Sequence, residues 1–501
     1  MENSVQDQCW RLIKSMSKSE KRNFKIYAKK QSNSGSLKFV KLFDLMDSRN
    51  EVDDKVLLKA VADGKPGKLA NLKRHLYQKV LISLRLVLIN KQEDIEIRQM
   101  VDFASILYGK GHIMDALRML EKARVAAVKH NFDFLHADIL EFQKLIEARH
   151  VTRSRQVKNK MDKLVNDSQA RAERNLHTSF QSNINIQTQG YYILNGHARN
   201  EKQAKRFEEF WAVNRRRFEQ YPLSEATFFE RINRMQSSMW RHYILLNLED
   251  AKEDALNCYG LFCINSLMTL RDPDSFVRSM YYVNALSFLI GDIENAVLHR
   301  NMLQKFYEER HPQLNHNSKT NALIYQQLCR LNVDLAREDW ASAKREMLRM
   351  KSDPIFHPSN LPGHRRNLIR YKFSAIHFAL GDYKAAISQL QSILNSTGSL
   401  LRDDLLINTR LMLAIAYLEI DDFYMADYVV TNLSRNIRKN QYAGQMHDRT
   451  LSALRTMIKE ERRNWPLLLE DLNEAIKDLR DDPFEQKCLR FFNVAYWIDH
   501  R

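Results

Sequence analysis

The stretch "GDYKAA", residues 381–386, decides the fold, because close variants of it recur along the chain. The variants are "GHIMDA" (111–116), "GDIENA" (291–296), "EDWASA" (338–343) and "DDFYMA" (421–426), with a weaker copy "DAKEDA" at 250–255. Each copy ends in alanine and opens with glycine or an acidic residue five positions earlier. From the weaker copy onward the alanines are 40 to 47 residues apart, and a recurring pattern of this length indicates a repeat architecture.

The residue types within each copy suit a tight turn between two helices. A glycine or an acidic residue ends the first helix, and an aspartate four positions before the alanine accepts amide hydrogen bonds at the start of the second. These aspartates are Asp292, Asp339, Asp382 and Asp422. The bulky residue three positions before the alanine shares a helix face with it, and the small alanine lets a neighbouring helix approach closely. An apolar helical stretch precedes each turn, so each unit is predicted to be a helical hairpin.

The composition predicts the same fold class. The chain has 501 residues but only 13 glycines and 9 prolines, well below ordinary usage of about 7% and 5%. Strands need turns, and turns need these two residues, so a mainly helical chain is expected. Hydrophobic residues make up 44% and charged residues 28%, which is a globular composition.

The turn series resembles that of the tetratricopeptide repeat (TPR) family, whose units carry a "GDYxxA" turn at this place. The resemblance covers residues 235–440 and one unit at 96–130, with longer units than the family's period of about 34 residues. It implies an all-α fold in which residues 96–501 form a TPR-like α-solenoid of helical hairpins with a concave groove. Residues 1–95 are predicted to form a small, basic N-terminal helical domain.

In TPR proteins the first helix of each hairpin lines the groove. When the helix register of TPR proteins is carried over to this chain, the resemblance implies six residues that bind a partner protein segment. These are Trp240, Arg278, Tyr281, Tyr325, Asn332 and Tyr371. The alternative is that these side chains form core between hairpins. Some family members hold a peptide's terminal carboxylate with a clamp of lysine, asparagine and arginine, and only Asn332 matches it. The resemblance therefore implies docking through apolar and aromatic contacts.

The N-terminal region concentrates positive charge. Residues 1–90 hold 19 lysines and arginines against 9 acidic residues, in a chain of formal charge +17. In "SMSKSEKRNFKIYAKK" (15–30), Ser17 and Glu20 form a capping box at a helix start. On the predicted helix, one face carries Lys18, Arg22, Lys25 and Lys29, and the other carries Phe24, Tyr27 and Ala28, which we expect to be buried.

The basic stripe has two interpretations. It is either a solvated helix face or a surface that neutralises the phosphates of a nucleic acid. The stretch shows no trusted helix-turn-helix signature, no zinc-finger spacing and no RNP-type strand.

Motifs of enzyme chemistry are missing from the sequence. It contains no P-loop, no GxGxxG, no HExxH and no GxSxG. The five cysteines form no CxxC pair, which favours reduced, mostly buried thiols in a cytosolic protein. The most apolar run, "VLISLRLVLI" (80–89), is far shorter than the roughly 20 residues of a membrane span. We expect no catalytic residues, no cofactor and no metal.

The chain end is predicted to be an amphipathic helix that caps the last repeat through Phe491, Phe492, Ala495, Tyr496 and Ile498. Taken together, the sequence predicts a cytoplasmic, non-catalytic protein–protein interaction scaffold. The alternative is a nucleic-acid-associated regulator that uses the basic N-terminal domain.

Overall fold

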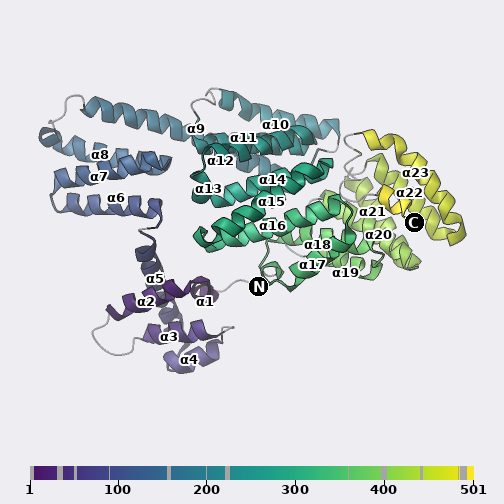
Figure 1. Ribbon diagram of the computed structural model, residues 1–501, viewed down its shortest axis with the longest axis horizontal. Helices are drawn as coiled ribbons and strands as arrows, with labels where there is room; N and C mark the ends of the chain where they lie inside the picture. Colours follow the sequence, from purple (N-terminus) through teal and green to yellow (C-terminus); the bar gives the residue numbers. More distant parts are fainter. Residues whose placement is uncertain are drawn as a thin grey trace. The chain divides into compact units, whose positions relative to one another are not determined.

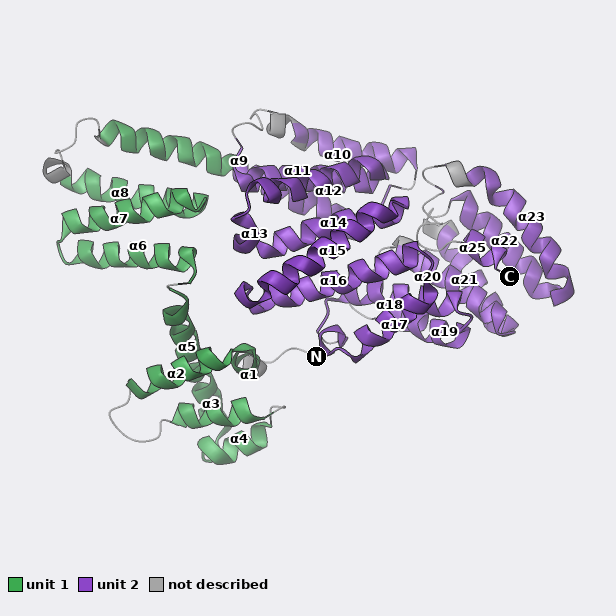
Figure 2. Ribbon diagram, in the orientation of Figure 1, with its two compact units in different colours: residues 1–177 green, residues 178–501 purple. Residues whose placement is uncertain are grey.

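The computed structural model shows a helical protein (Figure 1). It describes residues 5–30, 38–49, 53–89, 91–154, 160–198, 200–219, 226–358, 360–396, 403–440, 444–482, 485 and 494–500. Every regular element of these residues is a helix, so the prediction of an all-α chain is confirmed. The chain forms two compact units, residues 1–177 and residues 178–501 (Figure 2).

The first unit contains two separate hydrophobic cores. Its helices are α1 (Val5–Ser15), α2 (Lys18–Lys30), α3 (Lys38–Ser48), α4 (Asp54–Val61), α5 (Pro66–Leu88), α6 (Glu93–Gly109), α7 (Ile113–Lys129) and α8 (Asp133–Ser154), followed by α9 (Lys160–Asn195), which continues into the second unit. Helices α1 to α5 enclose one core, in which Phe24 and Phe43 are fully buried. Helices α6 to α8 enclose another, which includes Leu120 and Ile139. The predicted domain boundary near residue 95 lies between these two cores.

The second unit is a succession of helical hairpins. Its helices after α9 are α10 (Glu201–Glu219), α11 (Phe228–Leu245), α12 (Leu248–Ile264), α13 (Met268–Arg271), α14 (Pro273–Ile290), α15 (Ile293–Arg310), α16 (His316–Ala336), α17 (Trp340–Ser352), α18 (Gly363–Ala379), α19 (Tyr383–Leu394), α20 (Asp403–Glu419), α21 (Phe423–Asn440), α22 (Gln445–Lys459), α23 (Trp465–Lys477) and α25 (Val494–Asp499). Helix α14 packs against its hairpin partner α15 and also against α16, the first helix of the next hairpin. Each hairpin therefore buries its apolar face against the following one.

The turns between the paired helices have the predicted geometry. Gly291 and Gly381 adopt positive φ angles of 78° and 71°, and Glu338 and Asp421 adopt positive φ at the same place. The next residue is the predicted aspartate, and all four aspartate side chains accept an amide hydrogen bond three residues on. The buried alanines that follow are Ala116, Ala296, Ala343, Ala386 and Ala426. The hairpin prediction is confirmed at these turns.

At the weaker copy, residues 250–255, the sequence pattern predicts the hairpin turn four residues later than the structure has it. The left-handed residue is Leu246, with φ of 68°, and α12 begins at Leu248, so Ala251 is the residue equivalent to Ala296. Ala255 lies four residues further along, on the same helix face, and both alanines are fully buried. Because residues four apart share a face, the sequence pattern alone did not distinguish them.

The last helix joins parts of the second unit that are distant in sequence. Ala495 and Trp497 of α25 are buried, and Ile498 packs against the core of α18 to α23. The Trp497 indole donates a hydrogen bond of 2.7 Å to Glu419, and the Tyr496 ring lies 5.4 Å from that of Trp340 on α17. This helix thus contacts α17 and α20 in addition to α23. Phe491 and Phe492, also predicted for the cap, lie outside the described residues.

Removing the Asp292 side chain should destabilise one hairpin more than removing its counterpart Asp339. Asp292 accepts hydrogen bonds from the Asn295 amide and, at 2.8 Å, from the Lys252 ammonium, whereas Asp339 caps α17 through the Ser342 amide. We expect Asp292→Ala to lower the free energy of unfolding by about 2 kcal/mol, the upper end for a helix cap, and Asp339→Ala by about 1 kcal/mol. If urea unfolding shows that Asp292→Ala and Asp339→Ala lose the same free energy of unfolding, Lys252 does not contribute to the stability.

The Asp292 contribution should also depend on pH. Burial alone would raise the pKa of this carboxyl, but the hydrogen bonds from Lys252 and Asn295 outweigh it and lower the pKa to about 2. The unfolded chain titrates near 3.9, so the stabilisation is present above about pH 4 and is lost as the pH falls towards 2. The difference in stability between wild type and Asp292→Ala should therefore narrow over this window.

Candidate functional site

The first helices of three successive hairpins bring two arginines onto one tyrosine. The guanidinium of Arg365, on α18, donates a hydrogen bond of 3.0 Å to the Tyr325 hydroxyl on α16. It also lies over the Tyr325 ring, 4.9 Å from its centre. Arg278, on α14, interacts with the same hydroxyl, while its own buried Nε has no hydrogen-bond partner. Two positive charges therefore meet at a single neutral oxygen.

Tyr281 completes this cluster from α14. Its ring centre lies 4.6 Å from that of Tyr325, with the two rings tilted by 33°. Burial raises the pKa of the Tyr281 phenol, so the hydroxyl stays protonated at neutral pH. Burial acts to lower the pKa of Arg278, but the nearby Tyr282 and Tyr325 hydroxyls outweigh it, and the pKa is raised. The guanidinium therefore remains charged.

A second polar contact runs across the same three helices. The Lys372 ammonium, on α18, donates a hydrogen bond of 2.8 Å to the Asn332 side chain on α16. Asn332 in turn donates to Asn284 on α14 at 2.9 Å, and Asn284 donates to the Ala296 carbonyl at 2.7 Å. Lys372 also lies over the Phe288 ring, 4.6 Å from its centre. Burial lowers the pKa of Lys372 to about 8, so the amine is mainly protonated at pH 7.

The Arg365–Tyr325 contact and the Lys372–Asn332 contact are separated by the same number of residues on α18 and on α16. Lys372 follows Arg365 by seven residues, and Asn332 follows Tyr325 by seven. Seven residues make two helical turns, or about 10 Å, and return to the same helix face. We call the surface of Arg278, Tyr281, Tyr325, Arg365 and Lys372 the α14–α16–α18 face. Tyr325 is only 7% exposed, and the other four side chains are half-buried.

None of the three cations of this face is held in an ion pair. Within the described residues, Arg278, Arg365 and Lys372 form no salt bridge with an acidic side chain. Some other half-buried cations of the second unit do form one, as in the 2.6 Å contact of Arg241 with Glu208, whereas Arg330 and Arg370 bond to neutral oxygens. Asp272 interacts electrostatically with Arg278 without forming a salt bridge. The face thus holds positive charge without an ion-pair partner in a partly desolvated place, where a bound anion would be stabilised.

The structure separates the six residues predicted to line a groove. Arg278, Tyr281 and Tyr325 lie together, and Asn332 is buried beneath Lys372, with 2% of its surface exposed. Trp240, on α11, packs half-buried against Tyr192 and Tyr243. Tyr371 is 4% exposed and belongs to the hydrophobic core of α18 to α23, not to the core that contains Tyr325. Tyr371 therefore does not lie in the same cluster as Tyr281 and Tyr325.

Sequence reasoning missed Arg365 and Lys372. The sequence offered one signal, since both lie on the apolar helix before the "GDYKAA" turn and are seven residues apart, as Tyr325 and Asn332 are. The register chosen from the resemblance selected Tyr371, one residue before Lys372. Neighbouring residues are about 100° apart around a helix axis. A register that is wrong by one residue therefore selects a core position in place of a position on the face.

The N-terminal bundle carries the second candidate surface, on α2. Ser17 and Glu20 form the predicted capping box, with the Ser17 amide donating at 2.7 Å and the Glu20 amide at 3.2 Å. Phe24 and Ala28 are fully buried and Tyr27 packs against the same core, as predicted. These aromatic rings thus belong to the core of the bundle.

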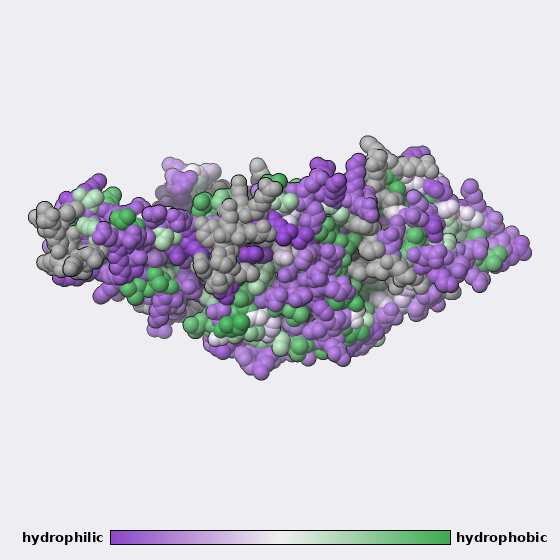
Figure 3. All heavy atoms as spheres, turned by 90° about the horizontal axis from the view of Figure 1, so that it is seen from above, coloured by the Kyte–Doolittle hydropathy of each residue, from purple (hydrophilic) through white to green (hydrophobic). Residues whose placement is uncertain are grey.

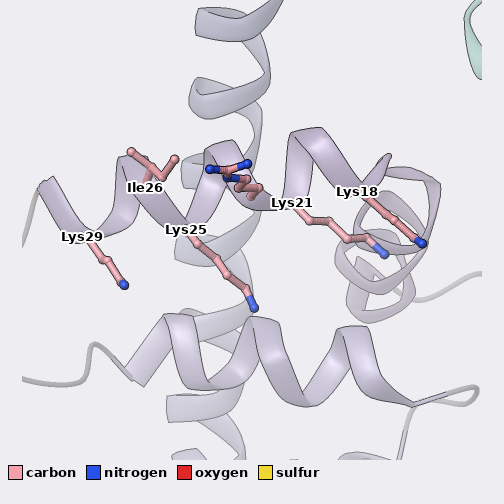
Figure 4. A pocket seen from close by; sticks show the side chains of 6 residues that line it. Lys18, Lys21, Lys25, Ile26 and Lys29 are labelled. Carbon is pink, nitrogen blue, oxygen red and sulfur yellow. The ribbon is translucent and has the colours of Figure 1, made fainter.

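The basic stripe of α2 is partly neutralised by α3. Lys25 extends from α2 towards α3 (Figure 4), where its ammonium lies 2.8 Å from Asp44. Lys18, Arg22 and Lys29 are exposed and form no ion pair within the described residues. The shallow depression beside them is lined by α2 alone. The stripe therefore presents three free cations on one convex helix.

The histidine, cysteine and acidic side chains of the described residues do not gather into a metal-binding group. No three histidine, cysteine or acidic side chains among them are placed to bind a metal ion. Cys9, Cys258 and Cys329 are buried and Cys263 is exposed, while Cys488 lies outside the described residues. Burial raises the pKa of the Cys9 thiol to about 12, so this thiol is not nucleophilic at neutral pH.

The surface gives no sign of a bilayer-spanning segment. In the part of the chain that the structure describes, no helix has both the length and the apolarity required to cross a membrane. On the face seen in Figure 3, hydrophilic residues predominate and hydrophobic residues occur in smaller groups.

Comparison with protein-family models, with curated proteins and with solved structures finds no match to this chain.

Proposed function

We propose that this chain is a cytoplasmic, non-catalytic scaffold whose second unit binds a segment of a partner protein. In this proposal the hairpins stack into a TPR-like α-solenoid, and the α14–α16–α18 face lines its concave side. The observation that carries the proposal is the face itself. Three successive first helices bring the guanidinium groups of Arg278 and Arg365 to the hydroxyl of Tyr325, whose ring belongs to the hydrophobic core of this region.

The hairpin packing supports this proposal. Each hairpin contacts the next one, as α14 does with α16, which is the nearest-neighbour packing of repeat proteins that bind extended segments. A similar turn with a positive φ angle recurs in successive units at Gly291, Glu338, Gly381 and Asp421. A surface that runs across several such units suits an elongated ligand better than a small molecule.

The test is to find the partner and map where it binds. The tagged full-length chain would be used to purify partners from its native host, and the partner would be identified by mass spectrometry. Amide hydrogen exchange of the complex should then show added protection on α14, α16 and α18. Protection confined to other helices would contradict the assignment of the binding surface.

The basic stripe on α2 supports a second candidate function, a nucleic-acid-associated regulator. The supporting observation is that Lys18, Arg22 and Lys29 are exposed and unpaired within the described residues. Each phosphate that such a side chain neutralises makes binding weaker as salt rises.

Replacing Lys18, Arg22, Lys25 and Lys29 with glutamine separates the two interpretations of the stripe. If the stripe is a solvated face, the free energy of unfolding should change by no more than about 1 kcal/mol. Within the described residues, the exposed Lys25–Asp44 pair is the single ion pair that the four substitutions remove. If the stripe binds duplex DNA, the slope of log affinity against log salt should fall by roughly 0.9 for each phosphate that is no longer neutralised. Absence of DNA and RNA binding by the wild-type chain at low salt would exclude the regulator function.

A further inference from the structure

The α14–α16–α18 face has a charge pattern that selects its ligand. Arg278 and Arg365 both interact with the hydroxyl of Tyr325, and neither forms an ion pair within the described residues. Like charges held this close repel each other, and the buried Nε of Arg278 has no hydrogen-bond acceptor. A carboxylate placed between the two guanidinium groups would satisfy both, because guanidinium and carboxylate pair with two parallel hydrogen bonds.

A second anion position lies two helical turns away. The Lys372 ammonium uses one donor on Asn332 and has further donors free, since a lysine ammonium carries three. Lys372 lies about 10 Å along α18 from Arg365, which is seven residues at about 1.5 Å each. In an extended segment of polyproline II conformation, residues i and i+3 lie on the same side and are about 9 Å apart.

We propose that the α14–α16–α18 face binds an acidic, extended segment of a partner protein that carries two carboxylate side chains three positions apart. One carboxylate lies between Arg278 and Arg365, and the other pairs with Lys372. This inference rests on the proposed function and specifies the ligand chemistry of the same surface. It replaces the expected apolar and aromatic docking, because Tyr281 and Tyr325 cover each other and Tyr371 is in the core.

The arrangement favours a peptide over a nucleic acid. Binding of single strands combines a long basic groove with exposed aromatic rings on which bases stack. Here the Tyr325 ring is covered by Tyr281 and by the Arg365 guanidinium, and only 7% of Tyr325 is exposed. Three cations at two positions match two carboxylates, not a continuous phosphate chain.

The test measures fluorescence anisotropy with the full-length chain at low salt. The probe is a short fluorescein-labelled peptide with two glutamates three positions apart, compared with the same peptide carrying glutamines and with an RNA oligonucleotide of equal charge. The glutamate peptide should bind and the glutamine peptide should not, while any RNA binding should be unaffected by changes on the α14–α16–α18 face. The double variant Arg278→Gln with Arg365→Gln should weaken binding about thirtyfold, the size of an interface hot spot.

A matched control is Arg310→Gln, which changes an exposed arginine on α15 and should leave the affinity unaltered. Lys372→Met should weaken binding of the peptide with two glutamates but not that of a peptide with one. Circular dichroism confirms that the helices persist in each variant. Undetectable binding of the glutamate peptide, RNA binding that the double variant also weakens, or full peptide affinity in the double variant would overturn the inference.

The two proposals fail in different ways. If a partner purified from the native host still protects α14, α16 and α18 in the double variant, the scaffold function stands and the acidic ligand is wrong. If no partner protects these helices in the wild type, the proposed function itself falls.

Discussion

Replacing Tyr371 with alanine should lower the free energy of unfolding of the second unit by about 3–5 kcal/mol, the usual cost of removing a large buried aromatic side chain. Tyr371 is 4% exposed and packs in the core that α18 shares with α19 to α23. Deleting its ring leaves a cavity among side chains that cannot fully collapse into it. The residue predicted from the sequence to bind a partner is thus expected to act mainly on stability.

Tyr424→Ala provides the matched control for this prediction. Tyr424 is on α21 and is 81% exposed, so its loss should change stability by less than about 0.5 kcal/mol. Because a repeat chain can unfold in parts, amide hydrogen exchange on α18 to α21 should accompany urea unfolding. A stable Tyr371→Ala variant that loses its partner would instead restore Tyr371 to the binding surface.

Trp465→Ala should destabilise the C-terminal hairpin of α22 and α23 by a similar amount, about 3–5 kcal/mol. The Trp465 ring is 2% exposed, and its indole donates a hydrogen bond of 3.1 Å to the Met457 carbonyl at the end of α22. The ring also packs edge-on against Phe423 of α21. One side chain therefore joins three helices, and its removal loses packing and leaves a buried carbonyl without its donor.

Two further variants separate the contribution of the packed Trp465 ring from that of its hydrogen bond to the Met457 carbonyl. Trp465→Phe keeps most of the ring and removes the donor, so a loss of about 1–2 kcal/mol is expected. Leu467→Ala, two residues along α23 at a position that is 65% exposed, should be nearly neutral. Hydrogen exchange should accelerate first in residues 445–477. Unchanged exchange there in Trp465→Ala would show that this hairpin does not depend on the tryptophan.

The hairpin turns were predictable because all their information lies within six consecutive residues. In "GDIENA" the glycine supplies positive φ, Asp292 accepts the amide of Asn295, and Ala296 leaves room for the neighbouring helix. The buried side of α2 was predictable for a similar reason, since Phe24 and Ala28 lie one turn apart on a face without charge. Local hydrogen bonds and helix periodicity suffice for such features.

The α14–α16–α18 face was only partly predictable. Arg278, Tyr281 and Tyr325 were among the residues predicted to bind a partner segment, and the structure brings these three together. Tyr371 was selected in place of Lys372 because the register on α18 was one residue off. The units of this chain are longer than the usual TPR unit, so a register carried over from that family shifts from one helix to the next.

The sequence by itself determined that this chain is helical, where the hairpins at Gly291, Glu338, Gly381 and Asp421 turn, and that α2 has a basic side. Only the tertiary structure decided that Arg278 and Arg365, 87 residues apart, share one tyrosine hydroxyl without an ion pair in the described residues. The reason is that this contact depends on the rotation of three helices about their axes. A change of one residue in any of them turns the side chain by about 100° and moves it off the face.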